Sequence, residues 1–277
     1  CLYLNQEEVQ ALRDREINTR SSGSELSNPD RGAPAQGGDI GDYNDFWFDR
    51  GSDGFTIDGR YPTSILTYPE NGRMPARTPE GQVKADAAPK FAWPERDGAW
   101  WLETGDQPYD GPENQTLGVR CIYQPSATIP IRPLVYNNLK TIVQTENYLM
   151  LNIEWMHWSR IIRIDDKEHM PTTLATFDGD SIGWWEGDTL VVETINFMNQ
   201  PHQPADRKVI ERFRPNNGGG LVYSFKVEDA DYTDSYSGEM VWPNSDQANY
   251  EYACHEGNHA MAGTLAGARV REREHRE

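Results

Sequence analysis

The chain has 277 residues and a formal net charge of −18 at pH 7, from 44 acidic and 26 basic side chains. This acidity argues against a nucleic-acid partner, since binding a phosphate backbone depends on clustered cations, and the absence of any run of about 18 apolar residues excludes a membrane-spanning helix. Only 36% of the residues are hydrophobic, and the aliphatic ones are scarce before about residue 130. We therefore expect one compact core with long loops rather than two equal domains.

The first element predicted along the chain is a short helix. Asn5 is followed three positions later by Glu8, the signature of a capping box, and apolar residues then recur at helical spacing, so residues 5–16 are predicted to form an amphipathic helix. Residues 21–41 are rich in Ser, Gly and Pro and offer almost nothing to bury. This stretch is predicted to be a surface loop.

A single strand is predicted before the sheet region begins. Residues 64–68 have the composition of a strand, and Asn71-Gly72 supplies the positive φ angles of a tight turn. Residues 75–118 return to Pro, Gly and charged residues, interrupted by tryptophans, and are predicted to be mainly loop. Residues 1–130 are thus expected to form a helix and loop-rich wrap that does not fold independently.

From about residue 140 the chain changes to short extended segments separated by turn signals. Leu149, Leu151 and Ile153 alternate with more polar residues, which predicts one face directed at a core. No long helix separates the segments, so parallel βαβ units are excluded and an antiparallel meander is expected. A meander of this length removes its two exposed edges most simply by curling into a barrel. The predicted strands are 140–145, 148–155, 157–165, 181–186, 189–197, 207–214, 221–228, 236–242 and 249–254.

The predicted fold class is therefore mainly β. Residues 131–277 are expected to form an antiparallel up-and-down β-barrel of the calycin type, with a β-sandwich as the competing architecture. The tail from about His259 to Glu277 is rich in Ala, Leu, Arg and Glu, which predicts a helix on the outside. Both parts belong to one domain overall.

Three cysteines are too few for a disulfide scaffold and lack the spacing of a zinc knuckle. Cys121 and Cys254 both fall in segments expected to be ordered, and a bond between them would stabilise the fold by about 4–5 kcal/mol on the chain-entropy model. The alternative is two buried free thiols. Cys1 fits either the lipid-modified first residue of a bacterial lipoprotein or the start of a fragment.

The most distinctive blocks of the sequence are LGVRCIYQP, YNNLKTIVQT, GWWEGDTLVVETINF, IERFR and YEYACHEGNHAMAGTLAGAR. Together they resemble a large family of uncharacterised secreted bacterial proteins for which no activity is established, over about Leu4 to Arg269. The resemblance implies export, a β-rich fold, a relationship between the segments around Cys121 and Cys254, and a chain that begins part-way through. Relatives commonly carry Tyr where this sequence has His259.

The segment His255-Glu256-Gly257-Asn258-His259 satisfies the HExxH pattern of zinc hydrolases. On one continuous helix both histidines would bind the metal, and Glu256 would act as general base on a water. Gly257-Asn258 is a poor helix interior, however, and the expected third ligand is not evident. The alternative is a strand end, a turn and a helix start with no metal.

A second candidate site lies in the segment WMHWSRIIRI. If its strand has one face inside a barrel, either His157 and Arg163 point inward or Trp158 and Arg160 do. An inward Arg beside Trp and a carboxylate such as Glu154 would bind an anionic or hydroxylated ligand, because guanidinium offers a fixed fork of donors. The alternative is an Arg on an exposed face or in an ion pair with Glu154, Glu193 or Glu211.

Aromatic residues form a third group of candidates. Trp184 and Trp185 lie at a predicted hairpin tip, and Tyr250 and Tyr252 share one face of a predicted strand. Such platforms bind sugar rings, and a nearby pair of acids could hydrolyse a glycoside, although aromatics also pack antiparallel sheets. An acidic segment from Asp39 to Asp58 resembles a calcium loop only loosely.

The leading hypothesis is an exported protein, periplasmic or extracellular, that binds or converts a small organic or carbohydrate ligand in a barrel pocket. The alternatives are a metal-dependent hydrolase and a structural or accessory subunit of a cell-envelope assembly, with a protein partner or a lipid anchor at Cys1. No cofactor is predicted, and zinc or calcium are the candidate metals. The predicted catalytic residues are His157, Arg160, Glu251, His255 and Glu256. The predicted ligand-binding residues are Glu154, Trp158, Arg163, Trp184, Trp185, Tyr250, Tyr252 and Asn258, and the predicted metal ligands are His255 and His259.

Overall fold

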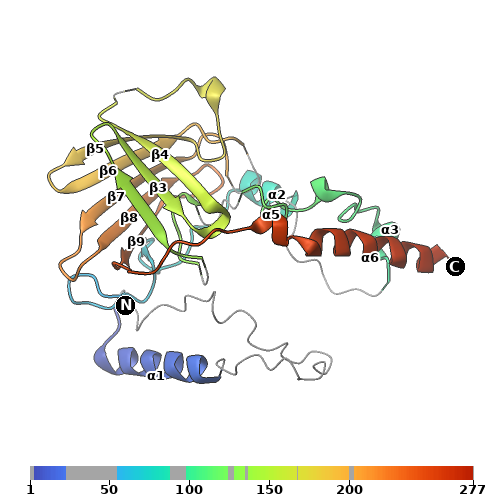
Figure 1. Ribbon diagram of the computed structural model, residues 1–277, viewed down its shortest axis with the longest axis horizontal. Coiled ribbons are helices and arrows are strands. Elements are labelled where there is room, and N and C mark those ends of the chain that lie inside the picture. The colour runs from blue at the N-terminus through green and yellow to red at the C-terminus, as the bar shows by residue number, and fades with distance from the viewer. Residues whose placement is uncertain are drawn as a thin grey trace.

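The computed structural model describes residues 3–22, 55–87, 98–123, 128–134, 137–166, 168–199 and 203–276, with the side chains of 16–22 left aside. Cys1 and most of the acidic segment considered for calcium lie outside these residues, and so does most of the predicted loop 21–41. Within them the chain is mainly β, and one sheet dominates the fold (Figure 1).

The described residues form one curled sheet of nine strands in the order β1-β9-β8-β7-β6-β5-β4-β3-β2. Because β1 and β2 are the two ends of this order, the sheet is a half-barrel with free edges (Figure 1). The strands are β1 (Leu66–Tyr68), β2 (Lys140–Gln144), β3 (Tyr148–Ile153), β4 (Trp158–Ile164), β5 (Asp180–Glu186), β6 (Thr189–Ile195), β7 (Lys208–Pro215), β8 (Leu221–Glu228) and β9 (Tyr236–Trp242).

Eight of the predicted β segments after residue 140 are confirmed, and two expectations about the sheet are wrong. Residues 249–253 form no strand, and their alternating tyrosines instead lie in an irregular segment. The sheet is also not wholly antiparallel, because β4 pairs with β5 in parallel through Arg163 with Ile182 and Ile164 with Gly183. In the described part of the crossover between these strands, residues 165–166 and 168–179, the only helical segment is the 3₁₀ turn η4 (Thr172–Leu174). The sequence therefore offered no long helix as a sign of a parallel connection.

The expected helices at both ends of the described chain are present. α1 (Gln6–Ser22) begins with the predicted capping box, in which Glu8 accepts from the Asn5 backbone at 2.8 Å and Asn5 accepts from the Glu8 backbone at 2.9 Å. α6 (His259–Arg276) forms the predicted C-terminal helix. The remaining helical segments are α2 (Pro79–Ala87), α3 (Trp100–Thr104), η2 (Pro112–Asn114), η3 (Trp155–His157) and α5 (Cys254–Gly257).

The prediction that residues 75–118 are mainly loop is wrong at α2 and α3. α2 begins where the Thr78 hydroxyl accepts from the Gly81 backbone at 3.1 Å, so a side-chain cap initiates it. Gly81 also lies so close to Asp231 that a Cβ there would approach its carbonyl oxygen to 2.2 Å. Contact with the sheet region, rather than local composition, therefore positions this helix.

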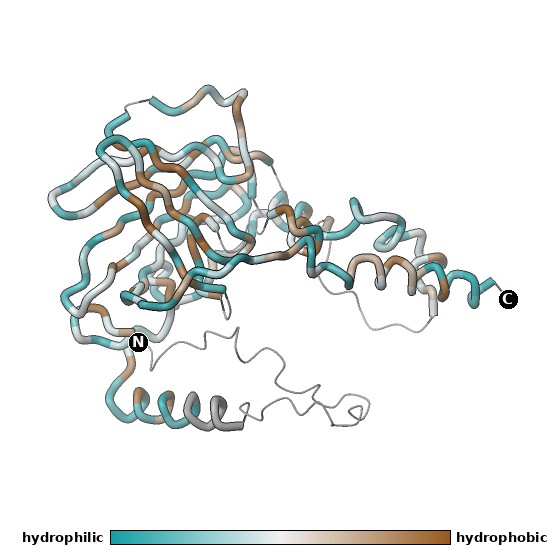
Figure 2. The backbone as a smooth tube through the Cα atoms, viewed as in Figure 1, coloured by the Kyte–Doolittle hydropathy of each residue, from teal (hydrophilic) through white to brown (hydrophobic). Residues whose placement is uncertain are grey.

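The core fills the concave face of the sheet. Inward-facing strand residues such as Leu151, Ile162 and Val192 are buried together with Ile129 and Ile131, which come from the chain before the sheet. Residues assigned to the predicted wrap and to the predicted β core therefore share one hydrophobic cluster. Hydrophobic stretches accordingly follow the strands, while the end of α6 is hydrophilic (Figure 2).

A second, smaller cluster joins α3 to α6, and these helices extend away from the sheet (Figure 1). Trp100 and Trp101 are buried there against Ala268, and the Trp101 indole donates to Glu272 at 3.1 Å. The predicted position of the C-terminal helix outside the sheet is confirmed. None of the helices that the structure describes is long and apolar enough to cross a membrane.

Candidate functional site

Strand β4 directs its Trp158 and Arg160 face into the half-barrel. Trp158, Arg160 and Ile162 are buried, whereas Ser159 and Ile161 are exposed. This resolves the two arrangements left open by the sequence. It also places a guanidinium, only 3% exposed, inside a hydrophobic core.

Arg160 is held by a chain of buried polar groups. Its Nη1 donates to Glu211 of β7 at 2.7 Å, and the other carboxylate oxygen of Glu211 accepts from the Tyr223 hydroxyl at 2.7 Å. That hydroxyl in turn accepts from the Ile131 backbone at 2.8 Å. Burial and the neighbouring Glu211 carboxylate raise the pKa of Tyr223, so the phenol stays protonated and donates.

Two donor groups of Arg160 remain without a hydrogen-bond acceptor among the described residues. These are Nε and Nη2, both fully enclosed. A buried donor left unpaired costs about 1–3 kcal/mol, so native proteins satisfy nearly all of them. Nε and Nη2 of Arg160 could therefore both donate to one further acceptor group.

A partly buried carboxyl group, that of Asp178, bonds Trp158. The Trp158 indole donates to Asp178 at 2.6 Å, and the Tyr123 hydroxyl bonds the carbonyl of the adjacent Phe177 at 2.9 Å. Burial raises the pKa of Asp178, and hydrogen bonds from Trp158 and Tyr123 together with the charge of Arg160 offset this only in part. We call Tyr123, Trp158, Arg160, Asp178, Glu211 and Tyr223 the inner polar cluster.

Replacing Asp178 with Asn is expected to stabilise the protein at neutral and alkaline pH. The amide oxygen of Asn can still accept from Trp158, while the cost of burying a carboxylate disappears. The pKa of Asp178 is higher in the folded protein than in the unfolded one. The wild type therefore loses stability as the pH rises from the unfolded-state pKa through the folded-state pKa. The advantage of Asp178→Asn accordingly shrinks as the pH falls. Urea unfolding at about pH 4, 6 and 8 measures this.

Asp178→Ala is the matched control for that substitution. It leaves the Trp158 indole without its acceptor and should cost about 1–3 kcal/mol. Equal destabilisation by Asn and Ala at every pH would contradict the role of Asp178 as a partly buried acceptor whose negative charge costs stability.

Glu154, His157, Tyr250 and Tyr252 come together at the connection between β3 and β4. Glu154 is 5% exposed, and its carboxylate accepts from Asn137 at 2.5 Å and from the Tyr250 backbone at 3.3 Å. The rings of Trp155 and Tyr252 pack with centroids 5.0 Å apart. The C-terminal segment thus docks on this turn, beside the sheet rather than within it.

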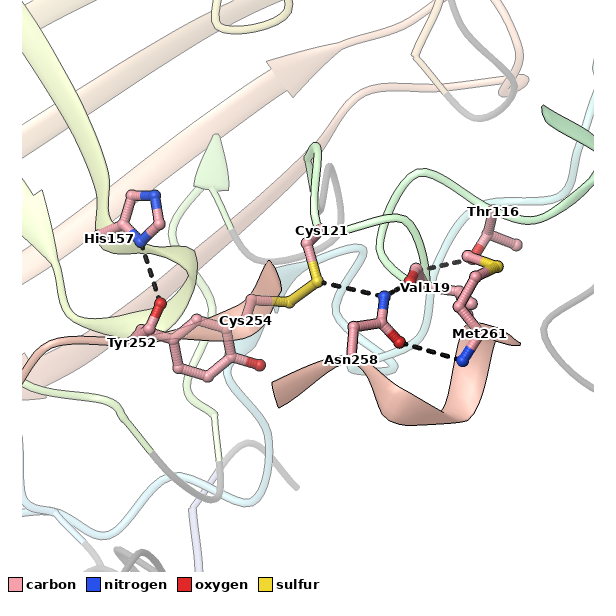
Figure 3. The surroundings of a disulfide bond; sticks show 8 residues. All are labelled: Thr116, Val119, Cys121, His157, Tyr252, Cys254, Asn258 and Met261. Atoms are coloured by element: carbon pink, nitrogen blue, oxygen red, sulfur yellow. Dashed lines mark hydrogen bonds between the residues drawn. A yellow bond between two sulfur atoms is a disulfide. The ribbon is translucent and has the colours of Figure 1, made fainter. Parts of the chain in front are cut away.

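His157 is exposed at the end of this turn, where its backbone has a positive φ of 40°. Its Nδ1 lies 3.1 Å from the Tyr252 carbonyl oxygen, as Figure 3 shows. Because a carbonyl only accepts, Nδ1 carries the proton in this contact. His157 is therefore oriented, but it lies outside the inner polar cluster.

The predicted bond between Cys121 and Cys254 is present, with Cα atoms 5.8 Å apart. Asn258 supports it from the side: its amide donates to the Val119 carbonyl at 2.8 Å and lies 3.6 Å from the Cys121 sulfur. Its side-chain oxygen accepts from Met261 at 3.3 Å, which caps α6 (Figure 3). These contacts give Asn258, predicted to bind ligand, a structural task.

The HExxH segment does not form one helix. α5 ends at Gly257, Asn258 has non-helical dihedrals, and α6 begins at His259. His255, Glu256 and His259 are exposed, and no group of three or more His, Cys, Asp or Glu side chains placed to hold a metal occurs among the described residues. The one-turn spacing of both histidines on a shared helical face is therefore missing.

Other predicted site residues lie on different surfaces. Arg163 faces the outer side of the sheet and pairs with Asp180 at 2.8 Å. Trp184 and Trp185 are consecutive in β5 and so point to opposite faces. Glu251 is exposed like His255 and Glu256. The five predicted catalytic residues thus do not meet in one cavity, since Arg160 is enclosed and the others are exposed.

Sequence reasoning missed Tyr123, Asp178 and Tyr223, and it considered Glu211 only as one of three ion-pair partners for an arginine. A signal for Glu211 existed, because it falls between Val209 and Phe213 in a strand whose alternate positions are apolar. A carboxylate at such a position requires a buried partner, and Arg160 is the one that the structure provides. Asp178 carried no such signal because it lies in the crossover.

A groove of about 310 Å³ lies on the outer face of the sheet, lined by residues of β1, β7, β8 and β9. Its charged residues are already paired: Arg212 with Glu186 and Lys226 with Glu228, each at 2.7 Å. The inner polar cluster is the stronger candidate because its donors are not fully used. Comparison with family models, with curated sequences and with solved structures finds no match to this chain.

Proposed function

We propose that the protein binds a small organic anion inside the half-barrel, with Arg160 as its anchor. The observation that carries this proposal is the pair of enclosed Arg160 donors, Nε and Nη2, that have no acceptor among the described residues. Neighbouring donors of one guanidinium match the two oxygens of a carboxylate. An anion there would complete the hydrogen bonding of a group that is otherwise costly to bury.

The charges around Arg160 favour a single acidic group on the ligand. Glu211 occupies one side of the guanidinium. Each acidic group of a ligand bound on the other side would lie near two carboxyl groups, Glu211 and Asp178. The raised pKa of Asp178 favours its neutral form, which reduces this repulsion. A ligand with several negative charges is therefore disfavoured.

The surroundings favour an apolar body for the ligand. Leu151 lies opposite Arg160 in the sheet register, and Trp158 and Ile162 flank it on the same face. Burial of apolar ligand surface against these side chains would stabilise the complex by about 25 cal/mol per Å². We thus expect a monocarboxylate with a hydrocarbon or aromatic part, rather than an unmodified sugar.

The test is a thermal shift and calorimetric titration with acetate, benzoate and dodecanoate, each beside its neutral counterpart acetamide, benzamide or dodecanol. At a concentration of about ten times Kd, a bound ligand adds about 1.4 kcal/mol of stability. We expect benzoate or dodecanoate to raise the melting temperature by about 3–5 °C, with the neutral counterparts and glucose having little effect.

The matched variant is Arg160→Gln combined with Glu211→Gln, which removes both charges and leaves no unpaired ion. This variant should remain folded and lose the difference between benzoate and benzamide. If no acid exceeds its neutral counterpart at 10 mM with the wild type, the proposal is wrong. A glucose shift that survives in the variant would instead point to a sugar site elsewhere.

The cellular compartment is part of the same proposal. Export to the periplasm or the cell exterior is supported by the Cys121–Cys254 bond, because disulfides persist in oxidising environments and are rare in the cytosol. Cellular fractionation followed by trapping of free thiols tests it, since an exported protein should keep both sulfurs blocked.

A further inference from the structure

Residues 168–179 of the crossover between β4 and β5, hereafter the strap, are fixed to the sheet at two places. Near its start, the Met170 backbone donates to Asp180 at 2.9 Å, and its carbonyl accepts from the Asn196 side chain at 2.6 Å. Near its end, Thr176 forms a bridge to Phe197. Between these points, residues 171–174 are exposed.

The His169 side chain bonds the first part of the strap to the sheet. Its Nδ1 lies 2.8 Å from a carboxylate oxygen of Asp180 on β5, and its Nε2 lies 3.1 Å from an oxygen of Glu193 on β6. The imidazole is only 13% exposed. Both ring nitrogens therefore face carboxylates from two different strands.

Both carboxylates also bond a second basic side chain, Arg163 at Asp180 and Lys208 at Glu193. Asp180 accepts two bonds from Arg163, at 2.8 and 3.0 Å. Burial alone would raise the pKa of Glu193, but hydrogen bonds from Lys208 and His169 outweigh it and lower that pKa. An ionised carboxylate only accepts, so both contacts are hydrogen bonds only when His169 carries two protons.

Loss of one proton would turn one of these bonds into a contact between two acceptors. Among the residues that the structure describes, the charged groups around His169 are Arg163 on β4, Asp166 and Glu168 in the crossover, Asp180 on β5, Glu193 on β6 and Lys208 on β7.

The other end of the strap reaches the inner polar cluster. Phe177 stacks on Tyr123 with ring centroids 5.1 Å apart, and its carbonyl accepts from Tyr123 and from Gln203. Asp178 accepts from the Trp158 indole. The strap thus contacts the cluster with its second half, while His169 holds its first half against the sheet.

We propose that doubly protonated His169 holds the strap closed, and that loss of one proton loosens the strap and uncovers the inner polar cluster. This regulation builds on the proposed function, since Arg160 is enclosed and a ligand must pass a movable part of the cover. A rise in pH thus opens the site and a fall in pH closes it.

The test follows the ligand-free protein by NMR between about pH 5.5 and 8.5. Imidazole ¹⁵N signals report whether His169 carries two protons or one. Hydrogen-exchange protection factors, corrected for the intrinsic pH effect, are measured for the backbone amides of Met170 and Thr176 and for the Trp158 indole. We expect these protection factors to fall at least tenfold over the interval in which His169 loses its proton.

His169→Gln supplies the variant and His255→Gln its control, since His255 is exposed and outside the strap. His169→Gln should show low protection at every pH, whereas His255→Gln should behave as the wild type. A neutral His169 ring at pH 5.5, or protection that stays constant while the ring titrates, would overturn the proposal. These readouts need no ligand. A failure of the pH-dependent opening can therefore be told apart from a failure of ligand binding in the benzoate and dodecanoate titrations.

Discussion

Replacing Cys121 and Cys254 together with alanine is expected to lower the free energy of unfolding by about 5 kcal/mol. The two cysteines are separated by 133 positions, and the chain-entropy model assigns a large loss of unfolded-state freedom to so long a loop. The bond joins the segment that fills the half-barrel to the base of α5. Urea unfolding of the variant, compared with the wild type with and without reductant, measures the effect.

Cys1→Ala is the control, because it removes the third thiol and leaves the bond intact. It should leave the free energy of unfolding unchanged, and reductant should bring the wild type to the stability of the double variant. A loss below about 1 kcal/mol in the double variant would show that the C-terminal segment is held by its other contacts, such as those of Asn258.

Breaking the buried Arg160–Glu211 pair should have an effect of similar size. The side chains are 3% and 0% exposed, so removing either one leaves the other charge buried without its partner, at a cost of about 3–5 kcal/mol. Arg160→Met and Glu211→Leu should each show this loss. The double variant should recover most of it, since apolar residues of similar volume replace the pair.

A neighbouring surface pair serves as the control for this cycle. Arg212 and Glu186 lie 2.7 Å apart but are 45% and 48% exposed, and such pairs are worth at most about 1 kcal/mol. Four-variant cycles for both pairs, measured by urea unfolding, give the coupling energies. Similar coupling in the two cycles would contradict the enclosed position of Arg160.

The β-sheet was largely predictable because its strands alternate apolar and polar residues. That alternation fails as a guide at Tyr250 and Tyr252, where the same pattern occurs in a segment that forms no strand. It also carries no information on direction, so the parallel pairing of β4 with β5 could not be foreseen. Pairing is decided by which edges meet in space, through a crossover that has no helix.

The candidate site was predictable only in part. The segment WMHWSRIIRI indicated that an arginine could face inward, and Arg160 does. Its partner Glu211 lies 51 positions away, and Asp178 reaches Trp158 from an irregular crossover. Contacts of this kind depend on sheet order and register, which no local pattern encodes.

The pairing of β1 with β9 has a consequence for biosynthesis. Leu66 pairs with Gly238, so β1 leaves the ribosome long before its partner strand exists. Ile129 and Ile131 likewise precede nearly all the strands that enclose them. These segments are made before most of the strands that cover them, so we expect the nascent chain to expose apolar side chains until the later strands emerge.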